Sequence, residues 1–124
     1  MTGTAVFRQA LSLLNYTDTH GDGGVPGGAT LYKRALPVLN QTVADLWYIG
    51  STEPFVPLTA LGDEIPLPLP TVLNVLPYGV AMLLAQIEGD ADNQALFAAQ
   101  YDQRRSSAAR AGGQILDRLP VCGG

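Results

Sequence analysis

Residues 62–90 read GDEIPLPLPTVLNVLPYGVAMLLAQIEGD, and this stretch decides the fold. Its first part carries prolines at 66, 68 and 70, which lack a backbone donor and favour an extended chain. The part that follows predicts a helix over 70–88, because Pro70 suits a first helical turn and Gly89 is a typical C-terminal stop. Apolar side chains cover nearly the whole circumference of this helix, which is typical of a helix buried on all sides.

Apolar periodicity predicts three further helices. The first covers about 4–15 and has Thr2 or Thr4 as its N-cap. The second covers about 31–49, with Thr30 as N-cap, and Pro37 inside it is expected to bend the helix or to delay its start. The fourth covers about 91–111, begins after Asp90 or Asp92 as N-cap, and ends where Gly112 and Gly113 follow each other.

A long extended segment, residues 52–69, separates the second and third helices; it is called the strap below. Its four prolines exclude a helix or a central strand, although short edge pairing around 56–59 is compatible with them. A structureless loop of this length in a compact domain indicates a function. The predicted fold is therefore mainly α, a four-helix subunit with a long extended Pro-rich loop between helices two and three. A helical domain covers 1–113, and a C-terminal tail covers 114–124.

Composition narrows the class of protein. The chain has 124 residues, which fits one domain, and a net charge of −4, which argues against nucleic-acid recognition. Arg104, Arg105 and Arg110 form a small basic group that we interpret as a solvated helix face. Charged residues make up only 15%, so much of the surface is uncharged, as in proteins that partners cover.

The same data set expectations for the compartment. The single cysteine, Cys122, allows no disulfide within the chain and favours a reducing compartment. The sequence shows no pattern of a signal peptide at its start. The longest apolar stretch, 75–85, is too short to span a bilayer. We expect synthesis in the cytoplasm and no membrane partner.

No motif predicts catalysis, a cofactor or a metal. Residues 18–23, DTHGDG, match the first half of a calcium loop, but Ala29 stands where a bidentate glutamate belongs. His20 and Cys122 are too few and too far apart for a zinc site. Phosphate-binding and dinucleotide fingerprints are absent from the sequence, as is a nucleophile elbow. We therefore expect a protein that is not an enzyme.

Five successive segments carry a resemblance to a known family: ALSLLNYTD, RALPVLNQTVADLW, LTALGDEIPLP, VLPYGVAMLLAQIEGD and DNQALFAAQYDQRRSSA. Their order over residues 4–110 resembles the head–tail connector (adaptor) proteins of long-tailed double-stranded DNA phages and related prophages. Pro37 and Pro77 depart from the family's pattern, since they interrupt predicted helices.

The resemblance implies a structural virion protein located in the neck, at the head–tail interface. Its subunits form a ring under the portal protein, a dodecamer in the virion, and the ring extends the channel through which genomic DNA passes without sequence-specific binding. The ring docks a stopper or tail-completion protein. The strap would contact neighbouring subunits through Phe55, Val56, Ile65, Leu67 and Leu69. The tail would dock the portal through Ile115, Leu116, Leu119 and Val121.

Two alternatives stay open on the sequence. One is another phage neck or tail-assembly component, such as a stopper, a tail terminator or an assembly chaperone, although stoppers and terminators tend to be β-rich. The other is a small phage-encoded regulatory protein that binds one host target. Capture of portal and neck or tail proteins would favour the connector interpretation, and capture of a single host protein without virion proteins would favour the regulatory protein.

Overall fold

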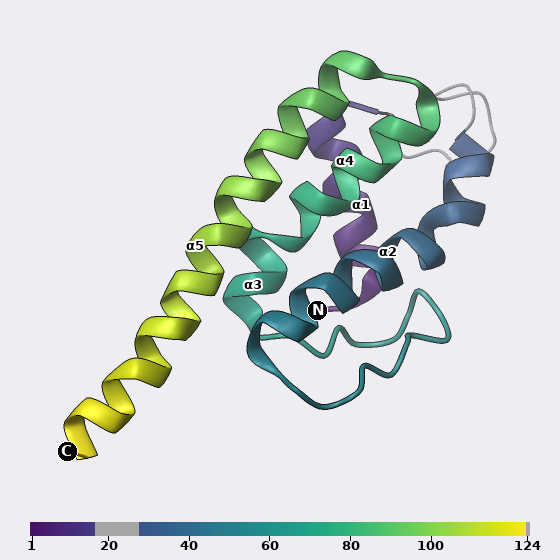
Figure 1. The fold of residues 1–124 in the computed structure, drawn as a ribbon. Helices are drawn as coiled ribbons and strands as arrows, with labels where there is room; N and C mark the ends of the chain where they lie inside the picture. The colour runs from purple at the N-terminus through teal and green to yellow at the C-terminus, as the bar shows by residue number, and fades with distance from the viewer. Residues whose placement is uncertain (17–27, 124) are drawn as a thin grey trace.

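The structure is a computed structural model that describes residues 1–16 and 28–123, with side chains described for 1–16 and 31–110. No strand occurs within these residues, which contain one isolated antiparallel bridge between Thr2 and Glu64. The prediction of a mainly α fold is thus confirmed. The described part of the chain forms five helices (Figure 1): α1 Gly3–Leu14, α2 Gly28–Gly50, α3 Leu69–Asn74, α4 Leu76–Glu88 and α5 Ala91–Gly123.

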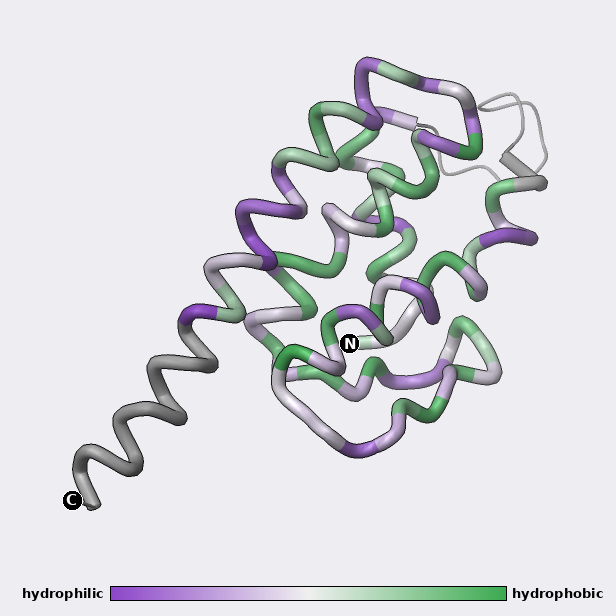
Figure 2. The backbone as a smooth tube through the Cα atoms, in the orientation of Figure 1, coloured by the Kyte–Doolittle hydropathy of each residue, from purple (hydrophilic) through white to green (hydrophobic). Residues whose placement is uncertain are grey.

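Helix α4 forms the centre of the core. It contacts α1, α2 and α5, which lie around it in Figure 1. Leu76, Val80 and Leu84 have no exposed surface, and Figure 2 shows hydrophobic residues along much of this helix. The predicted helix is therefore central, but it is not buried on all sides, because Met82, Leu83 and Ile87 are only partly buried.

Helix α4 lies very close to α2 and α5 at Gly79. A Cβ atom on Gly79 would lie 2.6 Å from Thr42 Cγ2 and 2.6 Å from Tyr101 Cε1. Real Cβ atoms do not approach other heavy atoms this closely, and the interior around the site is close-packed. A glycine is therefore required where these three helices meet.

The sequence predicts one helix over 70–88, but the structure has two, and this prediction was wrong. Val75 separates α3 from α4 with φ −121° and ψ −52°, outside helical values. Pro77 explains the break, because it has no N–H to donate to the carbonyl of Leu73 and its ring would clash with that carbonyl. Pro77 lies in the first turn of α4, where the missing donor costs little.

Helix α2 begins earlier than predicted and continues through its proline. It starts at Gly28, so Thr30 is not its N-cap, and it stays helical across Pro37. Pro37 and Lys33 are exposed, so water can bind the Lys33 carbonyl that loses its donor. Buried neighbours such as Leu39 hold the helix in place.

Helix α5 does not end at Gly112 and Gly113, as the sequence predicts, but continues to Gly123. Glycine costs only about 1 kcal/mol in a helix interior and ends a helix chiefly where it adopts a left-handed conformation. In Figure 1 the C-terminal part of α5 runs on beyond the other helices. Residues 114–123 are thus helical in their backbone.

Several predicted helix ends are confirmed. Thr2 caps α1, since its Oγ1 accepts a hydrogen bond from the Ala5 N–H at 3.3 Å. Gly89 ends α4 with φ 71°, in the left-handed region. Asp90 caps α5, because its Oδ1 accepts from the Asn93 N–H at 3.3 Å.

Within the described residues, Leu69–Glu88 is long and apolar enough to cross a membrane by length and composition, with a mean hydropathy of 1.4. Half of the most apolar 18 residues in this stretch are buried inside the fold. The break at Val75 also divides it into two helices. Both observations are those expected of core helices, so this stretch does not argue for a membrane span.

Candidate interaction surfaces

The strap is bound to its own chain through a side-chain clasp on α2. Asn40 donates from Nδ2 to the Leu58 carbonyl at 3.0 Å, and its Oδ1 accepts from the Leu58 N–H at 2.7 Å. An amide side chain that pairs with both backbone groups of one residue mimics a sheet partner. Leu58 is buried below this clasp.

The later part of the strap pairs with the beginning of α1. Gly3 N–H donates to the Asp63 carbonyl, Thr4 N–H to Leu61, and Ile65 N–H to Met1, at 2.8–3.1 Å. A Cβ on Gly3 would lie 2.9 Å from the Leu61 oxygen, so the close approach of the two segments depends on glycine. This pairing replaces the edge pairing around 56–59 that the sequence allowed.

A turn inside the strap is closed by Asp63. Its Oδ2 accepts from the Thr59 N–H at 2.9 Å, from Thr59 Oγ1 at 3.0 Å and from the Ala60 N–H at 3.1 Å. These bonds favour the charged form and lower the pKa of Asp63. Next to it, Glu64 pairs with the ammonium group of Met1 at 2.7 Å. Asp63 and Glu64 therefore serve structure, as expected for turn residues.

The first part of the strap rests on aromatic side chains at the end of α2. Trp47 Nε1 donates to the Glu53 carbonyl at 2.7 Å, and Phe55 N–H donates to the Tyr48 hydroxyl at 3.0 Å. The ring centroids of Trp47 and Phe55 lie 6.2 Å apart. The strap thus has contacts with its own chain at its beginning, middle and end.

The residues predicted to contact a neighbouring subunit fall into two groups. Ile65 is only 6% exposed and belongs to the chain's own core, and Phe55 and Leu67 are partly buried against that core. Val56 is 77% exposed and Leu69 is 57% exposed. The second group offers apolar surface to a partner, whereas Ile65 has almost none to offer.

Other predicted sites lie outside the described side chains. This applies to the portal-docking residues Ile115, Leu116, Leu119 and Val121 and to Cys122. The calcium-like loop with His20 lies outside the described residues altogether. Among the residues that the structure describes, no group of three or more His, Cys, Asp or Glu side chains could hold a metal ion.

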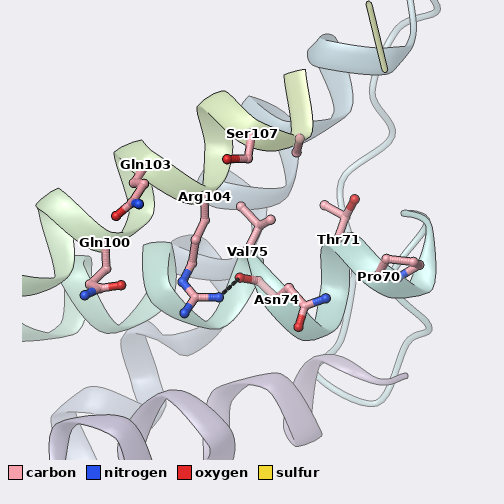
Figure 3. Close-up of a pocket in the computed structure, with 9 residues that line it drawn as sticks. Pro70, Thr71, Asn74, Val75, Gln100, Gln103, Arg104 and Ser107 are labelled. Carbon is pink, nitrogen blue, oxygen red and sulfur yellow. Dashed lines mark hydrogen bonds between the residues drawn. The ribbon is translucent and has the colours of Figure 1, made fainter. Parts of the chain in front are cut away.

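A groove of about 570 Å³ lies between α3 and α5 (Figure 3). Pro70, Thr71, Asn74 and Val75 line one side of it. Five residues of α5 line the other side: Gln100, Gln103, Arg104, Ser107 and Ala108. The groove combines neutral hydrogen-bonding groups with one charge, that of Arg104.

Arg104 reaches across the groove from α5 (Figure 3). Its Nη1 donates to the Asn74 carbonyl at 3.1 Å, and its guanidinium lies 3.9 Å from the centre of the Tyr78 ring. Its Nε is buried and has no hydrogen-bond partner. Sequence reasoning missed this role, because Tyr78 and Asn74 are distant in sequence and no local pattern links them to Arg104.

The next residue, Arg105, is fully engaged. It donates from Nε to Asp45 Oδ2 at 2.7 Å and from Nη2 to Asp45 Oδ1 at 3.1 Å. Tyr101 also donates to Asp45, at 2.6 Å. Burial alone would raise the pKa of Asp45, but the hydrogen bonds from Arg105 and Tyr101 outweigh it and lower that pKa. This cluster joins α5 to α2 and has a structural role.

A second tyrosine–carboxylate pair joins the end of α1 to the start of α5. Tyr16 donates to Asp90 Oδ2 at 2.8 Å, and Asn93 Nδ2 donates to the same oxygen at 2.7 Å. Burial and the bond to Asp90 raise the pKa of Tyr16, so it stays a neutral donor. Neither tyrosine has the lowered pKa that a nucleophile or general base needs near neutral pH.

Comparison with known proteins identifies no relative: no family model matches the chain, and no curated protein or solved structure is significantly similar to it. Function must therefore be argued from the chain's own surfaces.

Proposed function

We propose that this chain is a structural virion protein, a head–tail connector subunit that assembles with copies of itself under a portal protein and docks a stopper or tail protein. One observation carries the proposal. The strap is fixed to its own subunit at three places, and Val56 within it and Leu69, where it joins α3, are exposed to solvent. Large exposed apolar side chains on a braced segment are suited to contact with another protein.

The bracing of the strap favours assembly over a free arm. A segment that is already ordered loses little conformational entropy when a neighbour binds it. Prolines at 54, 57, 66 and 68 also restrict the strap before it is bound. An assembly subunit gains from this arrangement, since each copy can present the same edge in the same geometry.

Two further features agree with the proposal. The fold is mainly α, as the family resemblance implies. The last turns of α5 extend beyond the other helices in Figure 1, so their backbone is placed where a second protein could reach it.

The test is recovery of partners during virion production. In the strain that encodes the chain, cells producing virions are cross-linked, the chain is precipitated with antibodies, and the recovered proteins are identified by mass spectrometry. We expect portal and neck or tail proteins together with cross-links between copies of this chain. Recovery of a single host protein without virion proteins would contradict the proposal and favour a regulatory binder.

A matched pair of variants connects that result to the strap. The double variant Val56→Asp, Leu69→Asp places charge at the two exposed apolar positions. We expect it to abolish recovery of neighbouring copies while the helix content is unchanged. Leu96→Asp is the control, because Leu96 is also exposed, at 52%, but lies on the first turns of α5. Equal recovery from the strap variant and the control would show that the strap edge is not an interface.

A further inference from the structure

The α3–α5 groove carries positive charge, whereas the chain as a whole is acidic. The chain carries a net charge of −4, yet no acidic residue lines this groove among the residues whose side chains the structure describes. Arg104 lies inside it, and Arg110 donates to Ser107 on its wall at 3.4 Å. Two of the seven basic residues therefore gather at one groove of an acidic protein.

Arg104 and Arg105 are adjacent in sequence but differ in whether a carboxylate pairs with them. Arg105 forms two bonds with the carboxylate of Asp45. Arg104 bonds to a neutral carbonyl and forms no ion pair within the described residues. Its stacking on Tyr78 holds the guanidinium in place. The guanidinium group of Arg104 is thus fixed in position but has no carboxylate partner, and a carboxylate of a bound ligand would pair with it.

The neutral groups of the groove indicate the conformation of the ligand. Thr71, Asn74, Gln100, Gln103 and Ser107 all carry side chains that can donate or accept hydrogen bonds. An extended peptide has free backbone N–H and C=O groups for them to bind, whereas a helical peptide has already paired its own. The groups therefore suit an extended segment.

Apolar side chains also line the groove: Pro70 and Val75 on the α3 side, and Ala108 on α5. A ligand that lies in the groove would meet the charge of Arg104, neutral polar groups and these apolar side chains.

We propose that the α3–α5 groove binds an extended, acidic segment of another protein, with a carboxylate on Arg104 and apolar side chains against Pro70 and Ala108. This site does not depend on the connector role, because it would serve a regulatory binder equally well.

The probe is a synthetic peptide of about eight residues, blocked at both ends, in which glutamates alternate with leucines and prolines. The reference peptide carries glutamine in place of each glutamate. Binding to the full chain is followed by backbone amide NMR. We expect the acidic peptide to bind with a Kd of about 0.1–1 mM and to shift the signals of Asn74, Gln103 and Ser107. The glutamine peptide should bind about tenfold more weakly.

Variants locate the binding to the groove. Arg104→Gln should weaken the acidic peptide about tenfold and leave the glutamine peptide unchanged. Arg110→Gln, at the exposed edge, should weaken it less and keeps the test valid if Arg104→Gln lowers stability. Lys33→Gln is the control, because it removes the same charge from an exposed site on α2 and should change nothing.

Three results would overturn the proposal. The first is no shift at about ten times the expected Kd, and the second is equal binding of the acidic and glutamine peptides. The third is tighter binding of a short single-stranded DNA oligonucleotide at the same residues, which would make the ligand a phosphate chain. None of these results bears on the recovery of portal proteins, so the two proposals fail separately.

Discussion

Helix α4 and the strap both contain prolines and apolar residues, yet they are held in place by different interactions. Helix α4 is held by dense apolar contact, with Leu76, Val80 and Leu84 fully buried. The strap is held by a few hydrogen bonds and two buried anchors, Leu58 and Ile65, between exposed residues. We therefore expect added volume to lower the stability of the fold at any buried position of α4, whereas substitutions in the strap should lower it only at the anchors.

The largest effect is expected from adding volume to α4. Gly79→Val would place methyl groups into Thr42 and Tyr101, whose side chains already lie 2.6 Å from a built Cβ. We expect the free energy of unfolding in urea to fall by at least about 3 kcal/mol. Gly50→Ala is the control, since nothing lies within 4 Å of its Cβ, and it should change stability by less than about 1 kcal/mol.

The next effect separates anchors from exposed residues within the strap. Ile65→Ala should cost about 2–3 kcal/mol, because it removes buried methyl groups and leaves a cavity. Val56→Ala should change stability by less than about 0.5 kcal/mol, because Val56 is exposed. Thermal and urea unfolding of both variants measure the difference. Equal losses would mean that the strap does not contribute to the core through Ile65.

A smaller effect is expected from the clasp on α2. Asn40→Ala removes both partners of the Leu58 backbone, and we expect a loss of about 1–2 kcal/mol. Gln41→Ala, at an exposed neighbouring position, should be near neutral. If the two variants have equal stability in urea, the clasp does not hold the strap.

The smallest effect concerns pH. The pKa of Asp45 is lowered in the folded chain, so its carboxylate stabilises the fold above its ordinary pKa of 3.8, and this contribution is lost as the pH falls through the lower folded value. Its side chain is 43% exposed, so we expect Asp45→Asn to cost only about 0.5–1 kcal/mol at neutral pH.

Unfolding in urea at about pH 7 and about pH 3 measures the pH effect. The gap between the wild-type protein and Asp45→Asn should narrow at the lower pH. Asp63 and Asp90 also have lowered pKa values, so the variant should retain part of the acid sensitivity. A gap that is the same at both pH values would contradict the assigned role of Asp45.

The sequence predicts those parts of the fold that local chemistry controls. Apolar coverage identified the central helix, and Gly89 identified its end. The break at Val75 was also predictable, because the ring of Pro77 clashes with the preceding helical turn and Pro77 has no N–H to donate to it. The starting point of α2 and the continuation of α5 were not predictable, since Gly28 begins a helix and Gly112 lies inside one.

The candidate surfaces were harder to predict, because distant residues build them. The partner of Leu58 is Asn40, 18 residues away, and Arg104 meets Asn74, 30 residues away. No periodic pattern links such pairs in one sequence. Apolar residues in the strap also look alike in sequence, so Ile65 could not be distinguished from Val56 as buried or exposed.

The central claim is that the strap belongs to the subunit's own fold, and amide hydrogen exchange of the isolated chain tests it most directly. The Leu58, Thr59 and Ile65 N–H groups donate to Asn40, Asp63 and Met1 respectively. We predict that they exchange at least about tenfold more slowly than an unstructured peptide. Exchange of all three at the unstructured rate would show that the strap is a free arm, and would contradict the account.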